Sequence, residues 1–429
     1  MRVTSSTVSS QRHQPSLFNS FFQGSFPCST ACRREGKRLD MIISSGHDML
    51  IHKDYAALVE HRLLTARDGA RWYLIEKTPG EYDWSSFLPM VHAASQHGIQ
   101  VIWEVAHFGY PQHLDIWSVE FVDSFARFAR AMAEVMRNEG IEQPFFTPIN
   151  QISFWSWAGA EVAWLNPYAS GRGLALKKQL VRASLAAIAA IREVYPQARF
   201  VLTDPLVHVA PAADNATAQE EAQRQHLSQF DAWDMLCGKR CPELGGSPEA
   251  LDIIGLNYYP DNQWLSDGTT LNATHPAWRP LHLLLEEVWQ RYQRPMLIAE
   301  TGAEGEARVN WLNIVADEVE LALDQGVAME GISLYPVVEY PAWADDRRSP
   351  GPLFGLPDPN GSRTLYEPLA LALRSQQIKL QNRRKVKAGM AHRWAGRQKR
   401  QAAWCRSGLP ARQALDGGYR SARSWPRET

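Results

Sequence analysis

Pro295–Val337, PMLIAETGAEGEARVNWLNIVADEVELALDQGVAMEGISLYPV, is the stretch that decides the fold of this chain. Apolar runs of strand length form its first six residues and Gly331–Val337. In Val309–Gln325 the apolar residues instead recur at intervals of three and four positions. This order predicts a strand, an amphipathic helix and a second strand. Two strands joined through a helix lie parallel in one sheet and are connected by a right-handed crossover.

The same alternation repeats along the chain as far as about residue 374. The expected strands are Phe21–Phe26, Leu64–Trp72, Gln100–His107, Phe145–Gln151, Arg199–Thr203, Leu251–Tyr259, Pro295–Glu300 and Gly331–Val337. The expected helices include Trp84–His97, Val119–Asn138, Leu174–Val194, Pro280–Arg291 and Val309–Gln325. The polar segment between Pro205 and Gly246 should include the helix that follows the fifth strand and an excursion over the barrel mouth. Eight such units predict a closed (β/α)8 TIM barrel. An open doubly wound sheet is the alternative, but no G-x-G-x-x-G follows the first strand, so a dinucleotide site has no support.

The charges of the 429 residues are unevenly distributed. Lys+Arg (45) and Asp+Glu (46) nearly cancel, yet residues 375–429 contain 14 Lys/Arg and two acidic residues, which leaves residues 1–374 with a net charge of −13. We therefore expect a disordered segment at 1–16, the barrel at 17–374 and a basic, disordered C-terminal tail at 375–429. Such a tail could bind nucleic acid or an anionic surface. We instead expect an extension of low order, or a product of reading past the natural end of the frame, and no nucleic-acid partner.

Other features of the composition bear on the compartment and on cofactors. No run of 18 apolar residues occurs, and the segment before Leu17 lacks the apolar core of a signal peptide, so we expect a cytoplasmic protein without a membrane partner. Three residues separate Cys28 from Cys32, and three separate Cys237 from Cys241, a spacing that differs from zinc knuckles. We expect no metal and no cofactor, and no pattern in the sequence sets an oligomeric state.

Reactive groups of a (β/α)8 barrel lie at the C-terminal ends of its strands. The side chains at these positions are Arg67, Trp72, His107, Asn150, Gln151, Asn257, Tyr259, Glu300, Tyr335 and Trp343. A guanidinium, a carboxylate, amides, a histidine and aromatic rings around one cavity suit a neutral ligand with many hydroxyls. Sugars present hydroxyls to the polar groups and C–H faces to the rings. The sequence therefore favours a carbohydrate ligand.

Five motifs resemble those of family 1 glycoside hydrolases, the β-glucosidase group. They are Thr147-Pro148-Ile149-Asn150-Gln151, Asp252-Ile253-Ile254-Gly255-Leu256-Asn257-Tyr258-Tyr259, Ala299-Glu300-Thr301-Gly302, Arg67 five residues before Trp72, and His107-Phe108-Gly109-Tyr110-Pro111. The motifs stand in the family's order on the expected strands. The resemblance covers roughly residues 20–370 and leaves the basic tail outside.

The resemblance implies that Glu300 is a nucleophile held by Arg67 and Tyr259. A carboxylate that attacks an anomeric carbon needs a fixed orientation, which a guanidinium and a phenol supply while the carboxylate stays ionised. The alternative is a buried ion pair between Glu300 and Arg67 that only ties two strands together.

The resemblance also implies contacts with the sugar. Asn150 is expected to bind the 2-hydroxyl, His107 another ring hydroxyl, and Trp343 one face of the sugar, with Asn257 and Tyr335 as further substrate contacts. Two positions depart from the family: Gly109 stands where the family has Asp, and Ala342 where a sugar-binding Glu precedes the Trp. Because these departures affect the outer hydroxyls, the sequence does not assign the sugar.

The largest departure is Gln151, which stands where the family has its acid/base Glu. Retaining hydrolysis uses two carboxyl groups, and an amide cannot donate a proton to a leaving oxygen at neutral pH. Carboxylates that could replace it are Glu161, Glu104, Glu339, Asp345 and Asp346. Alternation along a strand is expected to turn Glu104 away from His107, unless the strand has already ended there.

The sequence thus predicts a retaining β-glycosidase or transglycosidase that works through a covalent glycosyl-enzyme on Glu300. Since Gln151 provides no acid, activated leaving groups should be favoured. The alternative is a catalytically impaired carbohydrate-binding pseudo-glycosidase. We interpret His47, His113 and His208 as scaffold residues and the basic loop at 33–38 as a solvated surface.

Overall fold

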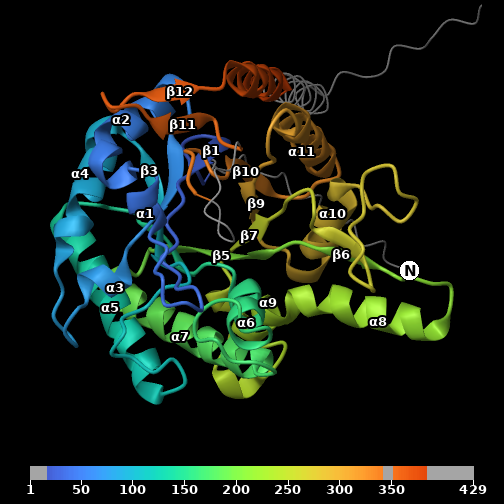
Figure 1. Ribbon diagram of the computed structural model, residues 1–429, viewed down its shortest axis with the longest axis horizontal. Helices are drawn as coiled ribbons and strands as arrows, with labels where there is room; N and C mark the ends of the chain where they lie inside the picture. Colours follow the sequence, from blue (N-terminus) through green and yellow to red (C-terminus); the bar gives the residue numbers. More distant parts are fainter. Residues whose placement is uncertain (1–16, 342–350, 384–429) are drawn as a thin grey trace, which may run out of the picture. The chain divides into compact units, whose positions relative to one another are not determined.

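The computed structural model of the chain describes residues 17–341 and 351–383. The chain divides into two compact units, Met1–Gln376 and Gln377–Thr429. In the larger unit a closed barrel has the strand order β1-β10-β9-β7-β5-β4-β3-β2, and every neighbouring pair is parallel (Figure 1). Its strands are β1 (Phe22–Ser25), β2 (Thr65–Gly69), β3 (Gln100–Ala106), β4 (Phe145–Ile149), β5 (Arg199–Pro205), β7 (Ile253–Asn257), β9 (Met296–Thr301) and β10 (Met329–Leu334). The predicted TIM barrel is confirmed.

The helices surround this barrel (Figure 1). Five lie where the apolar periodicity predicts them: α4 (Leu88–His97), α5 (Val119–Asn138), α7 (Gly173–Val194), α10 (Leu281–Tyr292) and α11 (Ala307–Asp324). The other helices are α1 (Met41–Ser44), α2 (His47–Glu60), α3 (Trp72–Ile75), α6 (Ile152–Ala160), α8 (Ala216–Leu227) and α9 (Asp231–Leu236), with 3-10 turns η1 (Trp84–Ser86), η2 (Ser228–Phe230), η3 (Pro242–Leu244) and η4 (Pro248–Ala250). Two short sheets pair β6 (His208–Ala210) with β8 (Gln263–Leu265), and β11 (Phe354–Pro357) with β12 (Arg363–Leu365).

Helix α5 shows how the apolar periodicity of the sequence becomes a buried helix face. Its N-terminus is capped by Ser118, whose hydroxyl accepts a hydrogen bond from the Phe121 amide. The buried face repeats at three and four residues and includes Phe121, Phe125 and Phe128. Trp72 packs against these three rings and is 1% exposed. The expectation that Trp72 faces the cavity is therefore wrong: β2 ends at Gly69, and Trp72 begins α3, which carries it into the core.

The barrel interior has an apolar layer beneath the strand ends. Buried side chains of β3, β4, β5, β7 and β9 meet there with Phe18, whose ring centroid lies 5.2 Å from that of Phe145. Ile102 belongs to this layer and pairs in register with Arg67, while Glu104 lies one inward position further along β3. Polar groups therefore begin immediately above the apolar layer, at the end of the barrel where the carboxyl ends of the strands lie.

Two further segments contain regular secondary structure, one between Pro205 and Gly246 and one at residues 367–383. The stretch between Pro205 and Gly246 forms β6, α8 and α9, so the helix expected after the fifth strand is confirmed. Residues 367–376 are helical, and so are 377–383, at the start of the basic tail; the low order expected for the tail stays a prediction. The remainder of the tail and residues 1–16 lie outside the described residues. Within the described part of the chain, no helix combines the length and the apolar character that a membrane span needs.

A buried ionic cluster joins α2 to β2. His47 is 0% exposed; its Nδ1 lies 2.7 Å from an Asp54 oxygen and its Nε2 lies 2.9 Å from an Asp68 oxygen. Arg363 also binds Asp54, and Tyr55 donates to Asp68. Burial acts to lower the pKa of His47, but the two aspartates outweigh it and raise that pKa to about 9. His47 is therefore scaffold, and it is a cation at neutral pH.

This cluster makes stability depend on pH. Because the folded-state pKa of His47 is raised from 6.5 to about 9, its contribution is complete below pH 6.5 and is lost as the pH rises through about 9. We expect the free energy of unfolding to fall by on the order of 3 kcal/mol across this window. Urea unfolding of the protein and of His47→Gln measures it: the variant should be less stable below pH 6.5 and should lack this fall. An equal fall in both proteins would contradict the assignment.

Candidate active site

Glu300 lies near the end of β9 and is 3% exposed. Its Oε1 accepts hydrogen bonds from Arg67 Nη1 at 3.0 Å and from Asn150 Nδ2 at 3.0 Å. Its Oε2 accepts from the Tyr259 hydroxyl at 2.8 Å. Burial and the charge of Glu300 raise the pKa of Tyr259 well above its usual value, so the phenol remains a donor. One carboxylate oxygen is thus held by a cation and an amide, and the other by a phenol.

Asn150 connects this carboxylate to the neighbouring strands. Its Nδ2 also lies 3.0 Å from His107 Nε2, and its Oδ1 accepts from Arg67 at 3.2 Å and from Thr203 at 2.8 Å. Because an amide nitrogen only donates, His107 Nε2 is the acceptor and the ring proton lies on Nδ1. Thr203, at the end of β5, is a site residue that sequence reasoning missed, since a threonine inside a strand carries no distinguishing signal.

Glu104 faces the barrel interior, which corrects the expectation that it turns away from His107. An oxygen of Glu104 lies 2.7 Å from His107 Nδ1, and the other oxygen pairs with Arg67. The alternation rule holds within β3, which ends at Ala106; His107 follows that end, where Phe108 has a φ of 61° and the chain turns. Burial opposes ionisation, but Arg67 and His107 lower the pKa of Glu104 to about 2. Glu104 is therefore a permanent counter-charge.

Gln151 lies beside Glu300. Its Nε2 is 3.4 Å from Glu300 Oε2, and its backbone has a φ of 51° at the N-cap of α6. Left-handed backbone at a residue other than glycine costs about 1–2 kcal/mol, which the surrounding hydrogen bonds must offset. Its amide N–H donates to Thr203 and its carbonyl accepts from Trp155. The side chain that replaces the expected acid therefore points at the carboxylate.

A cavity of about 1360 Å³ opens above these groups. Besides Glu300, five of the predicted site residues line it: His107, Gln151, Asn257, Tyr259 and Tyr335. Glu300 lines it as well, whereas Arg67 and Asn150, both 0% exposed, support the floor from behind. The Oδ1 atom of Asn257 is buried and has no hydrogen-bond partner in the structure. The volume is large enough for a small-molecule ligand.

The outer wall of the cavity is aromatic. Phe154 follows Gln151 by one helical turn on α6, and its ring centroid lies 6.0 Å from that of Trp157 and 6.1 Å from that of Trp164. The two indoles are 48% and 38% exposed. This wall was missed as a site feature, although the run Phe154-Trp155-Ser156-Trp157, which begins three residues after Gln151, was a signal that could have found it.

Several other residues that the sequence analysis considered have hydrogen-bond or ionic partners away from Glu300. Glu161 lines the cavity but is exposed, and it accepts a hydrogen bond from the Gly173 amide. Glu339 accepts one from the Leu356 amide and is not among the lining residues. His113 lies near Glu76, and His208 bonds the Ala277 carbonyl. Three further predicted residues, Trp343, Asp345 and Asp346, lie outside the described residues, as does Ala342.

Gly109 explains one departure from the family pattern. A Cβ atom at this position would lie 1.9 Å from Thr30 Oγ1 and 2.5 Å from the Thr30 carbonyl oxygen. No side chain fits there without moving the segment that carries Thr30, so an Asp at this position is excluded on steric grounds.

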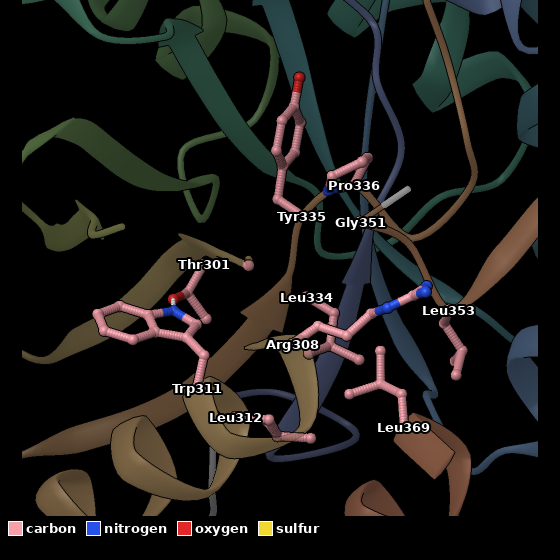
Figure 2. A pocket seen from close by; sticks show the side chains of 11 residues that line it. Thr301, Arg308, Trp311, Leu312, Leu334, Tyr335, Pro336, Gly351, Leu353 and Leu369 are labelled. Atoms are coloured by element: carbon pink, nitrogen blue, oxygen red, sulfur yellow. Dashed lines mark hydrogen bonds between the residues drawn. The ribbon is translucent and has the colours of Figure 1, made fainter. Parts of the chain in front are cut away.

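The two residues after Glu300 maintain the strand end. Thr301 Oγ1 accepts a hydrogen bond from Trp311 Nε1 at 2.8 Å, which ties α11 to β9 (Figure 2). A Cβ at Gly302 would lie 2.2 Å from the Tyr335 carbonyl oxygen, so any residue other than glycine would clash with the backbone that follows β10. The pocket between these residues has a volume of about 10 Å³, enough for one water at most. It supports the site and does not bind a sugar.

Among the described residues, Cys28, Glu104 and His107 form a buried group whose ligand atoms could hold a metal ion. The remaining cysteines of the described chain, Cys32, Cys237 and Cys241, are free.

The fold matches solved structures. A family 1 β-glucosidase from Thermotoga maritima in complex with isofagomine lactam superimposes with a TM-score of 0.68 at 15% identity, covering 84% of this chain and 98% of that one. The chain has the fold of the family 1 β-glucosidases. The same β-glucosidase in complex with glucoimidazole gives a TM-score of 0.70 at 14% identity, and the AHE enzyme from Alicyclobacillus herbarius gives 0.70 at 17%; both alignments cover 84% of this chain and 98% of the other. Protein-family models and curated protein sequences gave no match.

Glu104 should contribute strongly to stability. Replacing Glu104 with Gln leaves Arg67 with one carboxylate fewer and removes a charged acceptor from His107, so we expect a loss of about 3–5 kcal/mol in the free energy of unfolding. Glu161→Gln, an exposed carboxylate on the same cavity, should change it by less than about 0.5 kcal/mol. Urea unfolding of both variants at pH 7 measures this, and similar stabilities would contradict the role given to Glu104.

Proposed function

We propose that the protein is a retaining β-glycosidase or transglycosidase that acts through a covalent glycosyl-enzyme on Glu300. The observation that carries the proposal is the geometry around one carboxylate, which is buried, ionically held and placed beside an amide at the floor of a cavity. The fold of the β-glucosidases supports the choice of a carbohydrate substrate.

The first step assigns different tasks to the two carboxylate oxygens. Oε1 accepts from both Arg67 and Asn150 and is fully engaged. Oε2 accepts one short bond from Tyr259 and a long one from Gln151, so it retains a lone pair toward the cavity. We assign Oε2 as the atom that attacks the anomeric carbon. The guanidinium and the phenol then keep the carboxylate oriented while the bond to the leaving oxygen breaks.

The leaving group departs without a proton. Gln151 occupies the position from which an acid would act, and its amide donates hydrogen bonds but does not release a proton at neutral pH. Loss of general acid catalysis typically costs ~10²–10⁴-fold for a poor leaving group and little for a good one. Substrates are therefore glycosides of stable anions, such as phenolates, carboxylates or sulfated thiohydroximates.

The second step, attack of water or another acceptor on the glycosyl-enzyme, also lacks a base at Gln151. The amide can orient the acceptor by a hydrogen bond without removing its proton. Release of the leaving group should therefore be faster than turnover, and the glycosyl-enzyme should accumulate.

Leaving-group dependence tests the proposal. A dinitrophenyl glycoside should give a burst of one equivalent of phenol followed by a slow steady rate, and the alkyl glycoside of the same sugar should react at least about 10²-fold more slowly. Azide should speed the steady phase, because this anion needs no base. Stopped-flow absorbance at several enzyme concentrations measures the burst.

Controls separate chemistry from binding. Glu300→Gln should abolish the burst, and mass spectrometry of the protein trapped with a 2-fluoro glycoside should place the label on Glu300. Equal rates for the aryl and alkyl glycosides would contradict the assignment of Gln151. Sugar binding without release of dinitrophenol would instead identify a carbohydrate-binding pseudo-glycosidase.

Gln151→Glu tests whether only the acid is missing. This variant should raise the rate on alkyl glycosides by about 10²-fold or more and have a smaller effect on dinitrophenyl glycosides. The pH profile of the Glu variant should have an alkaline limb, because the acid must be protonated, and this limb should be absent with Gln151. Gln151→Met, a neutral control of similar length, should show neither change. An unchanged rate on alkyl glycosides in the Glu variant would overturn the proposed role of position 151.

A further inference from the structure

Cys28, Glu104 and His107 converge behind the floor of the cavity. Cys28 Sγ lies 3.3 Å from Glu104 Oε2 and 3.4 Å from His107 Nδ1, and the latter two atoms are 2.7 Å apart. All three side chains are buried. The thiol fits because Gly69 lies opposite: a Cβ there would be 2.7 Å from Cys28 Sγ. A thiol, an imidazole and a carboxylate oxygen thus face one point.

We propose that these three residues form a binding site for a soft divalent cation, represented by Zn²⁺ or Cd²⁺. Zinc binds sulfur at about 2.3 Å and nitrogen or oxygen at about 2.0–2.2 Å, so tetrahedral ligand atoms lie about 3.4–3.6 Å apart. The two separations that involve sulfur are already close to this range. Only the His107–Glu104 contact must open, by less than about 1 Å. The side of His107 that lines the cavity provides the route of entry.

Charge favours the same ligand class. Arg67 contributes one positive charge to this buried group, whereas Glu104 and Glu300 contribute two negative charges. Burial and the neighbouring Glu104 raise the pKa of the Cys28 thiol well above its usual value, so the thiol is neutral without a metal. A divalent cation that binds the thiolate and releases one proton changes the sum of these charges from −1 to zero. Thiolate and imidazole ligands select soft or borderline cations over Mg²⁺ or Ca²⁺.

Occupation of the site reverses the hydrogen bonding of His107. With Nδ1 bound to a cation, the ring proton must lie on Nε2, which then cannot accept from Asn150 Nδ2. Asn150 also donates to Glu300, so the change reaches the carboxylate directly. The metal therefore inhibits the site, a consequence that rests on the proposed glycosidase function, whereas binding itself does not.

Binding is tested without activity. Titration of the full-length protein with Cd²⁺ should produce the ultraviolet charge-transfer band of a thiolate bound to cadmium. One equivalent of the bound Cd²⁺ should depend on Cys28. Cys28→Ala should lose that equivalent, and Cys237→Ala, which removes a buried thiol outside the cluster, should keep it. Near-ultraviolet circular dichroism establishes that each variant is folded. If Cys28→Ala binds as many equivalents of Cd²⁺ as the wild type, or if the wild type gives no band, the proposal is overturned.

Inhibition is measured separately, with the dinitrophenyl glycoside as substrate. Zn²⁺ should inhibit the wild type and Cys237→Ala alike, and Cys28→Ala should need at least about tenfold more Zn²⁺. Equal sensitivity of all three proteins overturns the coupling to His107. If the wild type does not hydrolyse the substrate, the proposed function fails, and the Cd²⁺ titration still decides the metal site.

Discussion

The buried guanidinium of Arg67 is the interaction on which the site depends. It pairs with Glu104 on β3 and Glu300 on β9, and it donates to Asn150 beyond the end of β4. A buried carboxylate without a partner would lose its charge, and a buried guanidinium without a partner would cost several kcal/mol. Four segments of the barrel, from β2, β3, β9 and the end of β4, must therefore keep their positions for these groups to remain paired. The apolar layer below prevents water from entering beneath them and screening the interaction.

This constraint gives Gln151 its significance. A network with one cation and two carboxylates tolerates an amide at 151 without further change, because the amide adds a weak hydrogen bond and no charge. A second carboxylate next to Glu300 would add repulsion, which a glycosidase with a full acid pair must overcome. The Glu300 carboxylate is thus held by the Arg67 cation, while the side chain beside it, Gln151, is neutral. The same balance leaves room for a cation beside Cys28, where the surrounding charges sum to a negative value.

Much of the site could be predicted from strand ends, and the failures have identifiable causes. Glu300, Asn150 and Tyr259 were placed correctly because each follows or ends a strand whose apolar run is unmistakable. Glu104 was misplaced because alternation was continued through His107, beyond the end of β3. Trp72 was misplaced for the same reason, since β2 ends three residues earlier and the chain turns into α3.

By itself, the sequence determined the eightfold alternation of strands and helices, and with it the barrel and the rim on which polar side chains collect. These features follow from periodicity, which depends on neighbours along the chain. Only the tertiary structure decided that Glu104 pairs with Arg67, that no side chain fits at Gly109, and that Cys28 lies against His107. Such contacts join residues up to 79 positions apart. These contacts depend on the stagger between neighbouring strands of the closed barrel and on the residue at which each strand ends. The local sequence pattern does not specify that geometry.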